Sequence, residues 1–178
     1  MKRFTGSAAV AAALLAVGCT SGSGPSPAAG PTAARGACRA VVPSADVSGW
    51  QTVEADGFTF CVPPDWTASG RTWSRGTARV TWGVGRTVAN ADVPAIVRAS
   101  NRPVASCVPS SAKGTVVDRR PEVIDGRQAQ VWRNRYRQGF YTGAHWSAPH
   151  VYIVGEATDS ATADLEMVIL RTTRVAAR

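Results

Sequence analysis

The sequence predicts an α+β domain in which a mostly antiparallel sheet carries a short middle helix and a C-terminal helix packed on it. Two Asp-Gly pairs, Asp56-Gly57 and Asp125-Gly126, each separate two runs that are rich in apolar residues. Such pairs are a strong signal for a tight hairpin turn. The last apolar stretch of the chain instead follows a helical spacing. Hairpins followed by one terminal helix favour antiparallel strands over alternating βαβ units.

The first half of the domain predicts two hairpins. Residues 50–55 and 58–62 flank the first Asp-Gly turn, and large apolar residues alternate along the second of these strands. The pair Pro63-Pro64 ends that strand, because proline has no N–H to donate to a sheet. Residues 71–75 and 78–82 alternate in the same way around a Ser-Arg-Gly turn and predict the second hairpin.

The second half predicts a short helix, further strands and a long connection. Residues 91–100 suit the helix, because an Asn or Asp can cap it and a proline lies in its first turn. Residues 114–120 and 128–138 flank the second Asp-Gly turn as strands. Glycine and proline in 140–150 predict a turn-rich connection, and 151–155 alternates as a last strand.

The clearest helix of the sequence lies near the C-terminus. Asp159 or Ser160 can cap it by accepting hydrogen bonds from the amides of the first turn. The residues at helical spacing, which we expect to cover the sheet, are Leu165, Val168, Ile169, Thr172 and Val175.

The run from Asp56 to Trp66, DGFTFCVPPDW, together with the terminal helix, resembles the PsbP-like family. Segments 126–129 and 151–154 are also similar to the middle of that family, so the likeness covers roughly residues 50–176. The family includes photosystem accessory proteins, a Ran-binding nuclear import factor and many bacterial lipoproteins. The resemblance implies a domain that binds or assists other macromolecules and is not an enzyme. It names no functional residue, because the matched positions build the core.

The N-terminus predicts a signal peptide over residues 1–18. Lys2 and Arg3 precede an apolar run that ends at Gly18-Cys19. This pattern resembles the lipobox of bacterial lipoproteins, in which the cysteine is lipidated (diacylglycerol, palmitate) and becomes the mature N-terminus. An ordinary secretory signal cut nearby is the alternative. We therefore expect a lipoprotein in the cell envelope, extracytoplasmic and lipid-anchored to a membrane through Cys19.

Two segments of different composition follow the signal peptide. Residues 19–37 hold the lipidated cysteine and a stretch of Ser, Gly, Pro, Ala and Thr, with Arg35 as the one charge. Such a composition predicts a disordered linker. Residues 38–178 form one domain, since they are enough for a single core and contain no second linker.

The formal net charge is +8, and it comes almost entirely from arginine. This balance suits an anionic envelope polymer, an anionic lipid or an acidic protein as partner, whereas we expect no nucleic acid for an envelope protein. Alternation along 128–138 places three arginines on one strand face, and we expect a binding surface there: Arg133, Arg135 and Arg137. Three arginines of the earlier hairpin could join it: Arg71, Arg75 and Arg79. A solvated sheet face without a partner is the alternative.

The cysteines predict one disulfide in an oxidising compartment once Cys19 carries lipid. We expect Cys38–Cys107, because this bridge would tie the lead-in of the domain to its body. Cys61–Cys107 is the competing pair. The spacings contain no CxxC pattern, so the sequence suggests no metal site and no cofactor.

Catalytic residues are scarce in this chain. His145 and His150 lie near no serine or cysteine motif of a known hydrolase type. The sequence therefore favours a non-catalytic binding or accessory module. The alternative is an extracytoplasmic hydrolase that uses His145 or His150.

Overall fold

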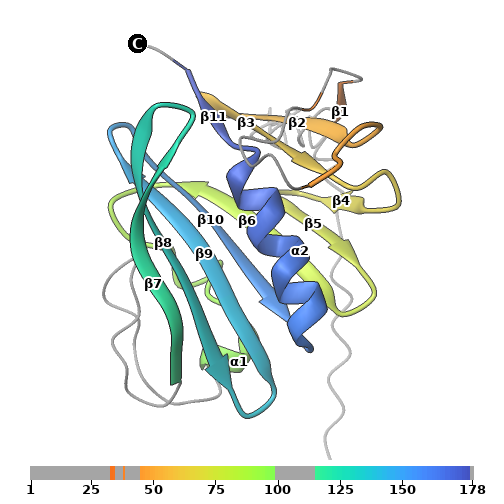
Figure 1. Ribbon diagram of the computed structural model, residues 1–178, viewed down its shortest axis with the longest axis vertical. Helices are drawn as coiled ribbons and strands as arrows, with labels where there is room; N and C mark the ends of the chain where they lie inside the picture. The colour runs from red at the N-terminus through yellow and green to blue at the C-terminus, as the bar shows by residue number, and fades with distance from the viewer. Residues whose placement is uncertain (1–32, 35–37, 39–44, 99–114, 177–178) are drawn as a thin grey trace, which may run out of the picture.

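The computed structural model describes residues 33–34, 38, 45–98 and 115–176. A seven-stranded antiparallel sheet dominates this part of the chain (Figure 1). Its strands, in the order in which they lie across the sheet, are β4 (Thr67–Ser69), β5 (Thr72–Arg75), β6 (Ala78–Val84), β10 (His150–Ala157), β9 (Gly139–Ser147), β8 (Arg127–Tyr136) and β7 (Thr115–Ile124).

A smaller sheet joins the two ends of the described chain. It has the order β1 (Ala33–Ala34), β2 (Gln51–Ala55), β3 (Phe58–Val62) and β11 (Arg174–Val175). The antiparallel pairing of β11 with β3 brings the C-terminal segment back to the first hairpin. β1 falls inside the predicted linker, where its two residues pair antiparallel with the edge of β2.

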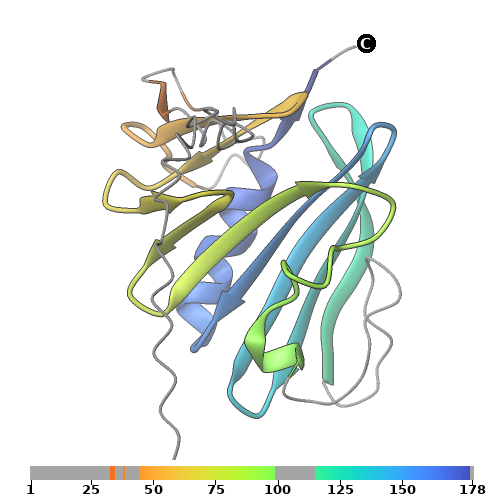
Figure 2. The same ribbon diagram turned by 180° about the vertical axis from the view of Figure 1, so that it is seen from behind.

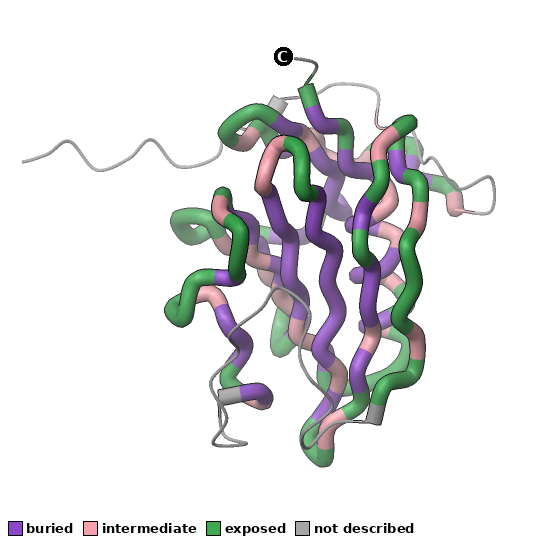
Figure 3. The backbone as a smooth tube through the Cα atoms, turned by 90° about the vertical axis from the view of Figure 1, so that its left-hand side faces the viewer, coloured by how far each residue is buried: buried purple, intermediate pink, exposed green. Residues whose placement is uncertain are grey.

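Helices cover the two faces of the large sheet. Helix α2 (Ser160–Arg171) packs on one face, and the short helix α1 (Ala95–Arg98) lies on the other with the chain before it (Figures 1 and 2). The face under α2 and the small sheet share one core, and a second core lies under α1. Figure 3 shows that the central strands are therefore buried along most of their length.

The predicted architecture is confirmed as a mostly antiparallel sheet with a short middle helix and a C-terminal helix. The sheet makes up more of the domain than a balanced α+β fold implies. Both Asp-Gly pairs form hairpin turns, and Gly57 and Gly126 adopt the positive φ angles of 80° and 74° that favour glycine. The second hairpin forms as β5 and β6.

The prediction of a turn-rich connection over 140–150 is wrong, because most of this segment is strand β9. β9 lies between two other strands and is covered on both faces, so its buried residues do not alternate with polar ones. Its glycine also has a packing role: a Cβ at Gly143 would overlap the indole of Trp132. In the sequence, Gly143 suggested a turn. In the fold, it allows the indole of Trp132 to pack closely against the backbone of β9.

Helix α2 starts where predicted and buries Ile169 as expected, but its buried face is otherwise shifted. The carboxylate of Asp159 caps it by accepting a hydrogen bond from the Thr162 amide at 2.8 Å. Leu165 and Val168 are only half-buried, which corrects our expectation for them. The buried residues of the helix are Ala163, Glu166, Met167, Ile169 and Leu170. The helix also ends at Arg171, so Val175 belongs to a strand.

The structure contains a disulfide between Cys38 and Cys61, which corrects the expected Cys38–Cys107 pair. Cys107 lies outside the described residues. Cys61 pairs across the small sheet with Thr52, and the Sγ of Cys38 lies 3.3 Å from the Oγ1 of Thr52. The bridge therefore does tie the lead-in to the domain, but through the nearest hairpin.

Candidate functional site

Two adjoining hollows lie on the sheet face opposite α2. The inner one has a volume of about 80 Å³ and lies between β6, β10 and the chain before α1. The outer one has a volume of about 470 Å³ and extends past the β5–β6 turn. Thr72, Arg79 and Glu156 line both hollows, which we together name the cleft. Figure 2 shows the chain around α1 in front of this face of the sheet.

Strand alternation places polar side chains in the cleft. On β6, Val80 packs into the core under α2, so Arg79 and Thr81 face the other way. On β10, Ile153 packs under α2, so Glu156 also faces the cleft. The burial of one face of these strands thus leaves the opposite face free to carry charge.

The first charged pair of the cleft joins Arg79 to Glu156. The two residues are register partners across β6 and β10, and their side chains form a salt bridge. The other carboxylate oxygen of Glu156 accepts a hydrogen bond from the backbone N–H of Ile96 at 3.2 Å. This bond fixes the start of α1 against the sheet.

The second charged pair joins Arg71 to Asp92, whose Nη2 and Oδ1 atoms are 2.9 Å apart. The other oxygen of Asp92 accepts a hydrogen bond of 2.5 Å from the hydroxyl of Tyr152. Burial and the nearby Asp92 carboxylate raise the pKa of Tyr152, which keeps this hydroxyl a donor. Asp92 thereby connects the segment before α1 to both β10 and the start of β5.

In both pairs the acidic side chain is much more buried than the basic one. The side chains of Asp92 and Glu156 are 7% and 12% exposed. Those of Arg71 and Arg79 are 44% and 39% exposed. The Asp92 and Glu156 carboxylates thus lie deep in the cleft and the Arg79 guanidinium group lies at its rim, whereas Arg71 reaches Asp92 from outside the lining of both hollows. The sum of the four formal charges is zero.

The predicted arginine surface does not form as one patch. Arg133 faces α2, where its Nη1 lies 2.5 Å from Oδ1 of Asp164 and its guanidinium covers the Phe140 ring. Arg79 lies on the opposite face of the sheet in the cleft, Arg71 pairs with Asp92 beside it, and Arg75 pairs with Asp65. Arg135 and Arg137 are exposed at the end of β8. Alternation correctly placed Arg133 on one face, but that face is occupied by a helix.

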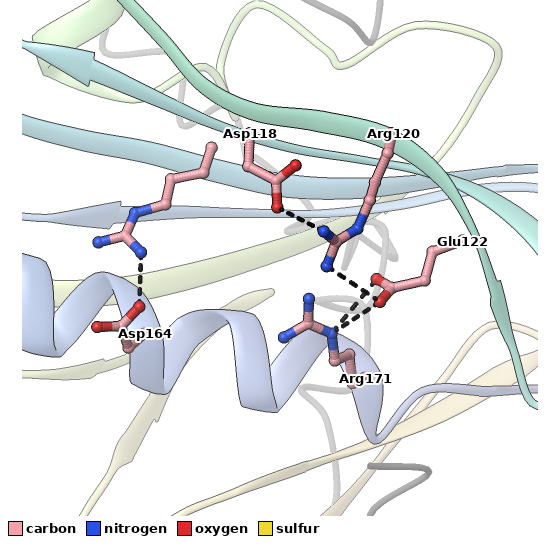
Figure 4. A network of polar contacts seen from close by, with 6 residues as sticks. Asp118, Arg120, Glu122, Asp164 and Arg171 are labelled. Atoms are coloured by element: carbon pink, nitrogen blue, oxygen red, sulfur yellow. Dashed lines mark hydrogen bonds and ion pairs between the residues drawn. The ribbon is translucent and has the colours of Figure 1, made fainter.

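Further ion pairs fasten α2 to the outer strand of the sheet (Figure 4). Glu122 on β7 contacts both Arg171 on α2 and Arg120, and Arg120 also contacts Asp118. The Glu122–Arg171 and Arg133–Asp164 pairs both involve α2, whereas the contacts of Arg120 lie within β7. Arginine on this side of the sheet therefore serves the packing of α2.

The two histidines lie together and line neither hollow. The rings of His145 and His150 stack with centroids 6.0 Å apart. Burial lowers the pKa of His145, and a hydrogen bond to the backbone of Gly85 partly offsets this effect. Neither ring hydrogen-bonds to a serine, cysteine or carboxylate among the described residues. In the part of the chain that the structure describes, the pair therefore has neither the nucleophile nor the orienting acid that a hydrolase of the triad type uses.

The sequence alone did not single out Glu156, Asp92 or Tyr152 as site residues. Asp92 was visible only as a helix cap, and Tyr152 only as one residue of an alternating strand. The signal that points to Glu156 is a carboxylate on a strand whose residues from Val151 to Gly155 carry no charge and are mostly apolar. Finding its partners needs the register between β6 and β10.

Within the described residues, no group of three or more histidine, cysteine or acidic side chains is placed to hold a metal ion. No helix in that same part of the chain is long and apolar enough to cross a membrane. No protein-family model matches the sequence, and no curated protein is significantly similar to it.

Proposed function

We propose that this protein is a non-catalytic binding module of the cell envelope, lipid-anchored to a membrane through Cys19, with the cleft as its binding site. The observation that carries this proposal is the pair of buried carboxylates, Asp92 and Glu156, beside the more exposed guanidinium group of Arg79 in one hollow. A concave site with a few convergent polar groups is what a small-ligand site requires.

The bonding of the polar groups in the cleft favours binding over catalysis. Each carboxylate already has a partner on both oxygens: Asp92 accepts from Arg71 and Tyr152, and Glu156 from Arg79 and Ile96. A general base needs an oxygen within reach of a substrate proton and a matched pKa. Groups held in this way are better suited to orient a ligand than to exchange protons with it.

The hydrolase alternative would use His145 or His150. We expect no ester or peptide hydrolysis by the purified full chain, because the stacked rings lack a nucleophile among the described residues. Turnover that disappears in His145→Ala would support the hydrolase and contradict a non-catalytic role.

The binding role is tested with the full chain purified from membranes in detergent. Small molecules extracted from the envelope should raise its melting temperature, because a ligand of the native state stabilises that state. Glu156→Gln should abolish the rise, whereas Glu122→Gln, which changes a paired carboxylate on the far face, should retain it. An equal rise in all three proteins would place the binding site outside the cleft.

The exposed Arg135 and Arg137 remain the candidates for contact with an anionic polymer, lipid or acidic protein. They lie at the end of β8, away from the ion pairs that hold α2. Such contacts would be weakened by salt, because exposed charges are screened.

A further inference from the structure

We propose that the cleft binds a small zwitterion, with a primary ammonium group in the inner hollow and a carboxylate at the rim, as in an amino acid or short peptide. The inference rests on the proposed binding function and names the ligand class of that same site. It follows from the depth of each charge, the free hydrogen-bonding capacity and the size of the two hollows.

The electrostatic gradient sets the orientation of the ligand. The carboxylates of Asp92 and Glu156 are nearly buried, so water screens them less than it screens the exposed guanidinium groups of Arg71 and Arg79. A positive group is therefore favoured deep in the cleft. A negative group is favoured at the rim.

The acceptors of the inner hollow match an ammonium group. A carboxylate oxygen has two lone pairs, and each oxygen of Asp92 and Glu156 accepts one hydrogen bond, from Arg71, Tyr152, Arg79 or Ile96. The hydroxyl of Thr81 also faces this hollow and bonds to that of Thr72 at 2.8 Å. An ammonium group donates three hydrogen bonds, and it is small enough for a hollow of about 80 Å³.

The rim supplies the group that would hold the carboxylate. Arg79 lines both hollows and contacts Glu156 through one terminal nitrogen. Its other nitrogens can donate to a second carboxylate, and arginine binds carboxylates with two parallel hydrogen bonds. The larger hollow beyond it leaves room for the remainder of the ligand.

Other ligand classes fit this arrangement less well. A polyanion would bring its charge against Asp92 and Glu156, and a simple amine would leave the rim guanidinium of Arg79 unused. A neutral sugar ring would not enter the inner hollow and would gain nothing from the charge gradient.

The test uses isotope-labelled full chain in detergent micelles, titrated with glycine, β-alanine and 4-aminobutyrate. These probes differ in the distance between ammonium and carboxylate. We expect one of them to shift the Ile96 amide signal saturably, because this N–H donates to Glu156. Ethylamine, acetate and glucose are the matched probes, and each should bind at least about tenfold more weakly.

Variants locate the ammonium end of the ligand. Glu156→Gln should weaken the best zwitterion at least about tenfold, with Glu122→Gln as the unaffected control. Thr81→Val provides a second variant if Glu156→Gln does not fold, and it should also weaken binding.

Saturable binding of glucose or of a polyanion, but of no zwitterion, would overturn the ligand class and leave the binding module intact. Equal binding of acetate or ethylamine would overturn the ligand class too. Absence of binding by every probe and by the envelope extract would contradict both proposals.

Discussion

Glu166 is an acidic residue that the fold buries completely between α2 and the sheet. Its Oε2 accepts a hydrogen bond of 2.6 Å from the Thr142 hydroxyl. Gly155 makes room for the carboxyl group, because a Cβ at that position would come too close to it. Burial raises the pKa of Glu166 to about 8, so the carboxyl group is mostly protonated at neutral pH.

The raised pKa predicts a stability that falls as the pH rises. In the unfolded chain Glu166 loses its proton near 4.5, whereas the folded protein keeps it up to about 8. The folded state therefore binds more protons in this window, and the stability that this group contributes below the window is lost as the pH rises through it. We expect the loss to reach about 1.4 kcal/mol per pH unit at most from one group.

Glu166→Gln removes that titration. Urea unfolding at a series of pH values should show a flatter stability profile for Glu166→Gln than for the wild type. Glu122→Gln provides the control, and its profile should follow the wild type in this window. Parallel profiles for Glu166→Gln and the wild type would mean that the carboxyl group is already ionised in the fold.

At the scale of elements, the packing of α2 explains why its buried face differs from the apolar face of the sequence. Ile169 and Leu170 are fully buried, and Arg171 and Asp164 form ion pairs with strands of the sheet. The two pairs are on different strands, β7 and β8, so together they fix the rotation of the helix. Leu165 then lies at the margin of the core.

Alanine substitutions distinguish the two faces of α2. Ile169→Ala should lower the free energy of unfolding by about 2–5 kcal/mol, because it opens a cavity in the core. Leu165→Ala should cost clearly less, since Leu165 is half-buried. Denaturant unfolding of both variants provides the measurement. Equal losses would mean that Leu165 is as deeply packed as Ile169.

At the scale of the whole molecule, the disulfide joins the chain that follows the predicted linker to the first hairpin. Cys38 bonds to Cys61 on β3, and β3 also pairs with β11 near the C-terminus. The start of the domain at Cys38 and the C-terminal strand β11 are therefore both attached to β3 of the small sheet. The cleft lies on the large sheet, lined from β5, β6 and β10.

A peptide map under non-reducing conditions should contain one peptide pair that joins Cys38 to Cys61. The bridge closes a segment with a sequence separation of 23 residues. In the chain-entropy model such a loop contributes about 3 kcal/mol, so replacing both cysteines by alanine should lower the free energy of unfolding by that order. A bridged peptide that contains Cys107 would contradict this pairing.

The proposed anchor predicts that Cys19→Ala releases the protein from membranes. The thiol of Cys19 is the site at which a lipoprotein of this type receives its lipid. Detergent-phase partitioning measures the effect: the wild type should enter the detergent phase and Cys19→Ala the aqueous phase. Identical partitioning of the two proteins would contradict lipidation. Arg35→Ala, in the same linker, should partition like the wild type.

The sequence by itself determined the local features of this protein. Turn residues such as Asp56-Gly57 and Asp125-Gly126 and the cap at Asp159 act through the backbone of a few neighbouring residues. Alternation also assigned Val151 and Ile153 to the face opposite Tyr152 and Val154, as the two cores confirm. The predominantly antiparallel sheet with its closing helix followed from these signals.

Only the tertiary structure decided which strands become neighbours and which side chains come into contact. β9 has no alternation because both of its faces are covered, so its character as a strand depends on its neighbours. Arg79 pairs with Glu156 because of strand register, and Cys38 reaches Cys61 because it lies beside Thr52, the register partner of Cys61. Register and helix rotation are set by contacts between distant segments. The cleft is built entirely from such contacts, and therefore no local pattern in the chain could reveal it.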